Sequence, residues 1–344
     1  MRKEIKKILV IQLKQIGDVL LTTSAVEVLR KNFPKAKIDF LVEEPSHEIL
    51  LENPFLDHVL VYKKKHPLNW LFQIRKKKYD MVIDFLSNPR SALLTYLSLA
   101  KIKAGPDYTS SKWAYNHKLT LNQENNPYTA FLKIDLLKTL KLREIFYPYP
   151  KFFLDKQTGQ YSKNEFQKLS IPVNSFVVGF APTSRRITRK WPESYYAKLA
   201  DMICKKYPNI HIILFWAPGE YETVKRIKDY LKNPNIHLSP KLLSLSKLGA
   251  MLKRCSLLIS NCNGSKHIAQ AVGTPTLGIY SSSNPQNWNP PNDLNHQYLH
   301  LKGLECIGCK KNECKNKNHL QCLYDLTPEM VFLKFKKMFK YKPL

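Results

Sequence analysis

Short apolar runs alternate with amphipathic stretches along the first half of the chain. Residues 7–11, 37–42 and 79–86 are nearly continuous apolar segments, each typical of a buried strand. Between and after them, apolar residues recur every three or four positions over 19–33 and again over 91–100, as in helices with one buried face. Continuous apolar strands that alternate with helices predict a parallel sheet covered on both faces.

The same pattern restarts after a polar stretch at 155–174. Further strand patterns lie at 175–180, 209–216, 257–260 and 276–280, and helical patterns begin at Pro192, Val224, Ser265 and Pro328. The sequence therefore predicts an α/β protein with two doubly wound domains, in which ligands bind at the carboxyl ends of the strands. The expected boundaries are residues 1–165, residues 170–325, and a C-terminal helix and tail over 326–344.

Composition supports a folded chain with an anionic partner. The 344 residues are 44% hydrophobic and 24% charged, and the formal net charge is +28. That excess favours nucleic acid, an anionic membrane surface or phosphorylated small molecules as partners. The apolar run at 8–13 is too short for a signal peptide core, and no stretch reaches the ~18–20 apolar residues of a spanning helix. We therefore expect a cytoplasmic protein, and seven cysteines in so long a chain do not indicate a disulfide scaffold.

Several familiar motifs are missing from the sequence. There is no G-x-x-x-x-G-K-[ST] loop and no G-x-G-x-x-G, which argues against a P-loop NTPase and an ordinary dinucleotide enzyme. There is no G-x-S-x-G elbow of a serine hydrolase. No D-x-D pair is present to seat a divalent metal on a diphosphate.

The first positive signal is Asp18, in a Gly-Asp pair between the first strand and its helix. A carboxylate at the carboxyl edge of the sheet is suited to act as general base toward an acceptor hydroxyl. The alternative is that Asp18 only caps the helix, and position alone favours that alternative.

The second signal is a basic loop after the strand at 175–180. Thr183 and Ser184 are followed by four cations at 185, 186, 189 and 190, and then by Trp191. Arg189 and Lys190 supply charge-assisted donors, and the helix that follows adds its positive end, so the loop is suited to grip a diphosphate. The alternative is a solvated basic loop.

The third signal is the segment Asn261, Cys262, Asn263, Gly264, Ser265, Lys266, His267, where a strand turns into a short helix. Free amides at that helix N-terminus favour an anion. The alternative for His267 is a histidine buried in the core.

The fourth signal is a C-x2-C-x4-C-x7-C cluster formed by Cys306, Cys309, Cys314 and Cys322. Four thiols this close are able to hold one tetrahedral zinc, although only the first spacing is typical of zinc sites. The alternatives are a structural zinc and an irregular loop of reduced cysteines.

Together these segments resemble glycosyltransferase family 9, the lipopolysaccharide heptosyltransferases. ILVIQLKQIGDVLLTTSAVEVLRKNFP is similar to the family's opening, and RKWPESYYAKLA is similar to its basic-Trp-Pro segment. SNCNGSKHIAQAVGTPTLGIYSSSNP is similar to its signature of Asn-Asp-Thr/Ser-Gly, followed at intervals by His, Ala-Ala and Gly-Thr-Pro. The resemblance runs from about residue 7 to 335, and it rests on the order and spacing of motifs that are each weak alone.

The resemblance implies a GT-B fold and an inverting, metal-independent transfer of heptose from ADP-heptose to the lipopolysaccharide inner core. Asp18 matches the catalytic base. Residues that match the donor site are Thr183, Ser184, Arg189, Lys190, Trp191, Asn261, Asn263, Gly264 and His267. No cofactor is required, since bound cations and helix dipoles replace a metal at the departing diphosphate.

The implied partners are an ADP-sugar donor and an anionic, lipid-linked acceptor. The resemblance places the protein at the inner face of the inner membrane, where the basic runs 63–65 and 75–78 are suited to peripheral contact with an anionic surface. The alternative for these runs is a solvated face. A specific nucleic-acid partner is not expected, because no reader motif is present.

One departure from the family pattern bears on activity. Cys262 stands where the family usually has Asp, so a carboxylate suited to the donor sugar is missing. This leaves two alternatives to an active heptosyltransferase: a protein that binds a sugar nucleotide without turnover, or an enzyme with a different donor sugar.

Overall fold

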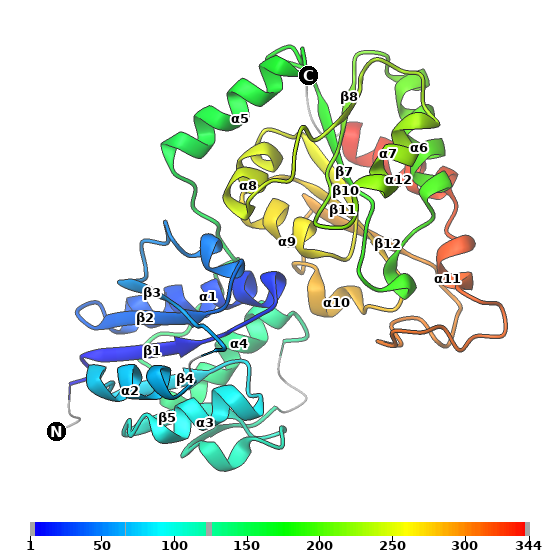
Figure 1. Ribbon diagram of the computed structural model, residues 1–344. Helices are drawn as coiled ribbons and strands as arrows, with labels where there is room; N and C mark the ends of the chain where they lie inside the picture. Colours follow the sequence, from blue (N-terminus) through cyan, green and yellow to red (C-terminus); the bar gives the residue numbers. More distant parts are fainter. Residues whose placement is uncertain (1–3, 66, 122–125, 341–344) are drawn as a thin grey trace. The chain divides into compact units, whose positions relative to one another are not determined.

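The computed structural model describes residues 4–65, 67–121 and 126–340 (Figure 1). The chain forms two compact units, Met1–Phe153 and Leu154–Leu344. Within the described residues each unit holds one six-stranded sheet, and every strand pair in both sheets is parallel. The two units are therefore built on the same plan, as the repeated sequence pattern predicts.

The sheet of the first unit has the order β3-β2-β1-β4-β5-β6. Its strands are β1 (Lys7–Ile11), β2 (Lys37–Val42), β3 (His58–Val61), β4 (Met81–Asp84), β5 (Ile102–Pro106) and β6 (His117–Leu119). Its helices are α1 (Ile16–Asn32), α2 (Pro67–Lys77), α3 (Pro89–Leu97) and α4 (Thr129–Leu137), with short 3-10 turns η1 (Ser46–Ile49), η2 (Lys112–Ala114) and η3 (Lys138–Leu140).

The central strand shows why the sequence adopts this arrangement. Ile8, Leu9, Val10 and Ile11 are completely buried, because helices cover both faces of the sheet. Helices α1 and α4 pack together on one face, and α2 and α3 lie side by side on the other (Figure 1). The strand order reverses between β1 and β4, so the carboxyl ends of these two strands form the switch point where such sheets bind ligands.

The second unit repeats this order as β12-β11-β10-β7-β8-β9. Its strands are β7 (Val177–Ala181), β8 (His211–Leu214), β9 (Ile236–Leu238), β10 (Leu257–Asn261), β11 (Thr276–Tyr280) and β12 (His296–His300). Its helices are α5 (Lys156–Lys168), α6 (Glu193–Lys206), α7 (Tyr221–Asp229), α8 (Leu245–Lys253), α9 (Gly264–Ala271), α10 (Pro285–Trp288), α11 (Gln321–Tyr324) and α12 (Pro328–Lys340), with η4 (Ile187–Arg189).

Helices again cover both faces of this second sheet. Helices α6, α7 and α12 lie on one face, and α5, α8 and α9 lie on the other (Figure 1). The switch point falls between β7 and β10, so the segments that follow these two strands meet at one edge.

Two expected boundaries differ from those of the structure. Residues 155–174, expected as a polar approach to a boundary near residue 165, contain helix α5, which belongs to the second unit. Its Ser162 accepts a 3.1 Å hydrogen bond from Arg254 Nε, and Arg254 also lies over the Phe166 ring. The C-terminal helix α12 packs on α6 within the second unit, and Val331 and Phe335 lie completely buried in its core.

Candidate active site

Asp18 lies in the first turn of α1, directly after β1 and at the switch point of the first sheet. The helix begins at Ile16 with Gln15 as its N-cap, so Asp18 is the third residue of the helix and not its cap. The Asp18 carboxylate instead accepts a hydrogen bond from the Gln15 backbone amide, as the third residue of a capping box does. Its side chain remains partly exposed. Burial raises the pKa of Asp18, and the charge of Lys133 opposes this rise. The structure thus allows a proton-accepting role beside the capping contact.

A buried cation lies close to Asp18. Lys133 on α4 is only 5% exposed, and its Nζ donates a 2.8 Å hydrogen bond to Gln12 Oε1 just after β1. The same ammonium lies 5.1 Å from the centre of the Phe85 ring. Burial lowers the pKa of Lys133 to about 8, while the charges of Asp18 and Asp84 act to raise it.

Asp84 is the second carboxylate at this switch point, and it is completely buried at the end of β4. Its oxygens accept hydrogen bonds from the Ser87 amide at 2.9 Å and from the Tyr115 hydroxyl at 2.8 Å. A Cβ at Gly105 would overlap the Tyr115 ring, so only glycine leaves room for it there. Sequence reasoning missed Asp84 and Lys133. For Asp84 a signal existed, because it is an acidic residue within the apolar run 79–86, where a buried strand is expected.

In the second unit, Trp191 and Asn261, which are expected to contact the donor, have hydrogen bonds within the protein. Both are completely buried. Trp191 Nε1 donates to the Leu326 carbonyl at 2.7 Å, and Asn261 Nδ2 donates to the Pro182 carbonyl at 2.7 Å. Asn261 Oδ1 also accepts from the Trp191 amide at 3.2 Å. These two side chains hold the loop after β7, the end of β10 and the segment before α12 together, and so support the site from within.

Asn263 and Thr183 are also engaged in contacts within the protein. Asn263 caps α9 by accepting from the Lys266 amide at 3.1 Å, and its Nδ2 donates to the Thr183 carbonyl at 3.0 Å. The Thr183 hydroxyl is buried and bonds to Glu220. Ser184 is more accessible and accepts a weak 3.4 Å bond from the Arg186 amide. The structure therefore joins the loop after β7 to the N-terminus of α9, where Gly264 is the first residue.

Two buried nitrogen atoms beside this helix N-terminus are unpaired. Arg189 Nε and His267 Nδ1 have no hydrogen-bond partner among the residues that the structure describes. Burial lowers the pKa of His267 well below its usual value, and the charges of Lys266 and Arg189 lower it further, so the imidazole is neutral at pH 7. Buried polar nitrogens that lack partners are costly, and they indicate a hydrogen-bonding group that the protein itself does not supply.

Lys266 is a second buried cation, completely covered within α9. Its Nζ donates to the Trp288 carbonyl at 2.6 Å and lies 5.6 Å from the centre of the Tyr280 ring. Burial lowers the pKa of Lys266 to about 8. Lys190, in contrast, pairs with Glu193 at 2.8 Å, and Glu193 also binds Arg226. Arg189, Lys266 and the helix end are thus the positive groups gathered here, whereas the charge of Lys190 is already compensated.

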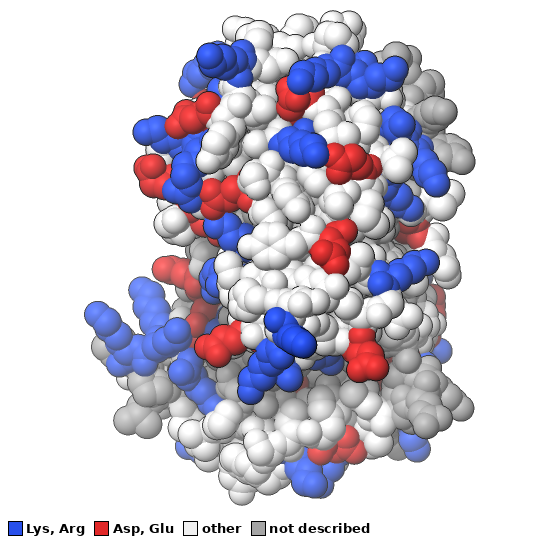
Figure 2. Space-filling model, turned by 90° about the vertical axis from the view of Figure 1, so that its right-hand side faces the viewer, with Lys and Arg blue, Asp and Glu red and all other residues white. Residues whose placement is uncertain are grey.

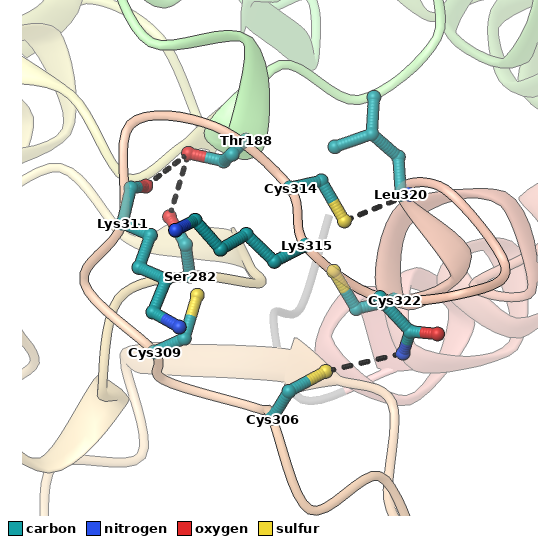
Figure 3. Close-up of a pocket in the computed structure, with 10 residues that line it drawn as sticks. Thr188, Ser282, Cys306, Cys309, Lys311, Cys314, Lys315, Leu320 and Cys322 are labelled. Atoms are coloured by element: carbon teal, nitrogen blue, oxygen red, sulfur yellow. Dashed lines mark hydrogen bonds between the residues drawn. The ribbon is translucent and has the colours of Figure 1, made fainter.

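The four cysteines of the C-terminal segment line one cavity of about 130 Å³, together with Thr188 and Ser282 (Figure 3). The Thr188 hydroxyl donates to the Lys311 carbonyl at 2.8 Å, which connects this segment to the basic loop. Among the described residues, no three His, Cys, Asp or Glu side chains are placed to share a metal ion. Four reduced thiols at Cys306, Cys309, Cys314 and Cys322 are what the structure shows, and zinc there stays a prediction.

On the face shown in Figure 2, basic side chains are spread over the surface and do not form a single stripe. Acidic side chains lie among them. Within the parts of the chain that the structure describes, no helix has the length and apolar character needed to cross a bilayer. Of the basic runs, Lys64 pairs with Glu43 at 3.1 Å and Lys77 pairs with Asp39 at 2.6 Å, so part of their charge is neutralised.

Taken together, the two switch points differ in chemistry. The first presents a partly exposed carboxylate held beside a buried ammonium, which suits removal of a proton from a hydroxyl. The second presents a helix N-terminus with unpaired donors and buried cations, which suits a phosphate or diphosphate.

Comparisons with known proteins identify the family to which this chain belongs. The family model described as glycosyltransferase family 9 (heptosyltransferase) matches residues 70–320. Lipopolysaccharide heptosyltransferase 1 of Campylobacter coli is 26% identical over 80% of this chain and 84% of its own length. The crystal structure of a family 9 glycosyl transferase from Veillonella parvula covers 99% of both chains with a TM-score of 0.86 at 23% identity.

A second solved structure, Escherichia coli heptosyltransferase WaaC with ADP-2-deoxy-2-fluoro heptose, has a TM-score of 0.70 at 21% identity. It covers 96% of this chain and 99% of its own. These likenesses confirm the GT-B fold that the sequence resemblance implies. The family model spans most of the chain and includes Arg189, Asn263 and His267. The chain therefore belongs to glycosyltransferase family 9, the heptosyltransferase family.

Proposed function

We propose that this protein is an inverting, metal-independent heptosyltransferase that transfers heptose from ADP-heptose to the lipopolysaccharide inner core, at the cytoplasmic face of the inner membrane. The observation that carries the proposal is the pair of unpaired buried nitrogens, Arg189 Nε and His267 Nδ1, at the N-terminus of α9. Family membership and the ADP-sugar bound by the Escherichia coli relative support a nucleoside diphosphate sugar as the missing hydrogen-bond partner of these nitrogens.

The donor's diphosphate is assigned to the switch point of the second sheet. Arg189, Lys266 and the amides that open α9 stabilise the negative charge that develops on ADP as it leaves. These groups take the place of a divalent metal. Ser184 is accessible beside them, while Trp191, Asn261 and Asn263 keep the two loops in register.

Asp18 is assigned as the general base. It accepts the proton of the acceptor hydroxyl while that oxygen attacks the anomeric carbon of the heptose. The bond between that carbon and the phosphate oxygen breaks, and its electron pair leaves with ADP. Attack from the side opposite the leaving group inverts the anomeric configuration. A carboxylate that is partly exposed yet close to Lys133 is suited to accept this proton and to return it to water.

The test combines transfer with binding in the purified full-length protein. Asp18→Asn should lose transfer from ADP-heptose to a lipid-linked acceptor by at least ~100-fold, as is typical for loss of a general base. It should still be stabilised by ADP in a thermal-shift panel of ADP, UDP, GDP and CMP, because the nucleotide binds the other unit.

Other outcomes of this test are equally informative. Preference for UDP or GDP would keep the fold and overturn heptose as the donor sugar. Clear ADP binding without turnover on any acceptor would show a sugar-nucleotide-binding protein, and Cys262 would be the first position to restore to Asp. Full transfer by Asp18→Asn would refute the role of Asp18.

A further inference from the structure

A group of large apolar side chains is exposed on the face of the first unit that carries α2 and α3. Leu93 and Tyr96 lie on α3, Leu99 lies just after it, and Trp113 lies in η2. They are 49%, 48%, 72% and 55% exposed. We call these four residues the aromatic patch. Single exposed apolar residues are common on protein surfaces, but a contiguous group indicates a binding surface.

A direct contact joins the two aromatic residues of the patch. The Tyr96 and Trp113 rings meet edge to face, with centres 5.4 Å apart. Lys103 Nζ lies 5.3 Å from the centre of the Tyr96 ring, so a cation borders the aromatic pair directly. Helix α2 adjoins α3, and Arg75 Nε donates to the Leu97 carbonyl at 2.8 Å. Phe72, one turn before Arg75 on α2, is also a large exposed apolar residue, at 69%.

The segment that carries the aromatic patch is predominantly basic, and one of its cations, Arg90, is paired with Glu43 at 3.0 Å. Residues 87–121 include five basic residues and a single acidic one, Asp107. Asp107 accepts a 2.6 Å hydrogen bond from the Thr120 hydroxyl. Exposed aromatic and aliphatic side chains bordered by Lys and Arg match the interface of an anionic bilayer, where the rings enter the headgroup layer and the cations meet phosphate.

We propose that the aromatic patch docks the protein on an anionic phospholipid bilayer. The basic border disfavours a second copy of the chain as the occupant, because symmetric association would bring the same positive charges face to face. The surface differs from the basic runs at 63–65 and 75–78, since its contribution comes from exposed rings as well as from charge. The docking requires no catalytic step, so its test is independent of the proposed transfer reaction.

The test uses the full-length protein and sedimentation with vesicles of phosphatidylcholine alone or mixed with phosphatidylglycerol. We expect wild-type protein to bind the mixed vesicles. Tyr96→Ala/Trp113→Ala should bind at least ten-fold more weakly. Tyr230→Ala/Tyr324→Ala, which removes two exposed aromatic residues from the second unit, should bind like wild type. Thermal unfolding checks that both double variants fold.

Two further measurements separate the contributions of charge and of the aromatic rings to vesicle binding. Lys101→Gln/Lys112→Gln should weaken binding to mixed vesicles by about five-fold per charge removed, whereas Lys156→Gln/Lys163→Gln on α5 should not. Subtracting the emission spectrum of Trp113→Phe from that of wild type leaves the emission of Trp113. Its maximum should shift to shorter wavelength when mixed vesicles are added, because the indole enters a less polar layer.

Three results would overturn the proposal. The first is absence of wild-type binding to mixed vesicles. The second is undiminished binding by Tyr96→Ala/Trp113→Ala, which would place the membrane contact elsewhere. The third is a change in oligomeric state, rather than in vesicle binding, caused by that double variant, which would show that a second copy covers the aromatic patch.

Discussion

Replacement of the buried Lys133 by Met tests how the first unit keeps its carboxylate ionised. Methionine has a similar length and is apolar, so it fills the space without the charge. Burial raises the pKa of Asp18 and the Lys133 ammonium lowers it, so Lys133→Met leaves burial unopposed. We expect the pKa of Asp18 to rise, and the acidic limb of the pH–rate profile to move to higher pH.

The size of this change follows from the chemistry of the pair. Lys133 has a pKa of about 8, so about nine in ten molecules carry the charge at pH 7. A nearby opposite charge typically lowers a carboxyl pKa by about 1–3. The acidic limb of kcat/KM should therefore move up by about one to three pH units, and each unit costs about ten-fold in rate at pH values below the limb.

Unfolding gives a second readout of the same residue. The ordinary pKa of lysine is 10.5, so holding the charge in the folded protein costs about 3 kcal/mol. Between pH 8 and 10.5 the unfolded chain binds this proton and the folded chain does not, so stability rises with pH in this window. Denaturant unfolding should show this rise in wild type relative to Lys133→Met, which lacks the titrating group.

Two variants serve as controls for the rate measurement. Lys133→Arg keeps the charge and should keep the limb close to its wild-type position. Lys31→Met removes an exposed lysine from the last turn of α1, and its profile should coincide with wild type. If the acidic limb of Lys133→Met also coincides with that of wild type while the variant is folded, Lys133 does not act on the base and the reasoning fails.

Three other predictions concern the second unit. Transfer should survive dialysis against EDTA, since Arg189, Lys266 and the start of α9 act on the diphosphate, and loss of activity that Mg²⁺ restores would contradict this. DTNB at pH 8 should modify Cys306, Cys309 and Cys314 before Cys204, Cys255 and Cys322, because burial raises the pKa of the latter three thiols; simultaneous modification in folded protein would be inconsistent with their burial. Trp191→Ala should lower the free energy of unfolding by about 3–5 kcal/mol in denaturant titrations, since the indole is completely buried and donates a hydrogen bond to the Leu326 carbonyl. A decrease below about 1 kcal/mol would show that the indole does not support the loop.

Much of the fold was predictable because buried parallel strands are strongly apolar. β1, β2 and β11 have the bounds expected from the sequence, and α9 and α12 begin within one residue of the expected positions. The elements that were missed have weaker patterns. β6 and β9 are three residues each, and α5 buries only Ser162, Glu165 and Phe166. Such a helix depends on packing against α8 rather than on its own periodicity, so its sequence resembles a polar linker.

The candidate site was predictable where chemistry follows directly after a strand. Arg189 and His267 come from segments that leave β7 and β10, which are neighbours in the second sheet, and Asp18 comes from the segment that leaves β1 in the first sheet. What the sequence does not distinguish is which polar residues at that edge face a ligand and which hold the loops. Asn261 and Trp191 belong to the same motifs as Arg189, yet their polar atoms bond to protein groups.

Buried cations were the hardest feature to predict from sequence. Lys133 occurs in the largely apolar segment 129–137, and lysine is seldom fully buried. Its charge is stabilised by carboxylates at 18 and 84, which are far away in sequence. Lys266 is likewise covered by the Trp288 carbonyl and the Tyr280 ring, from α10 and β11. In both units a lysine that tertiary contacts enclose adjusts the charge of the switch point. A variant of Lys133 should therefore change the pKa values of titratable groups in the first unit only. A variant of Lys266 should change those of groups in the second unit only.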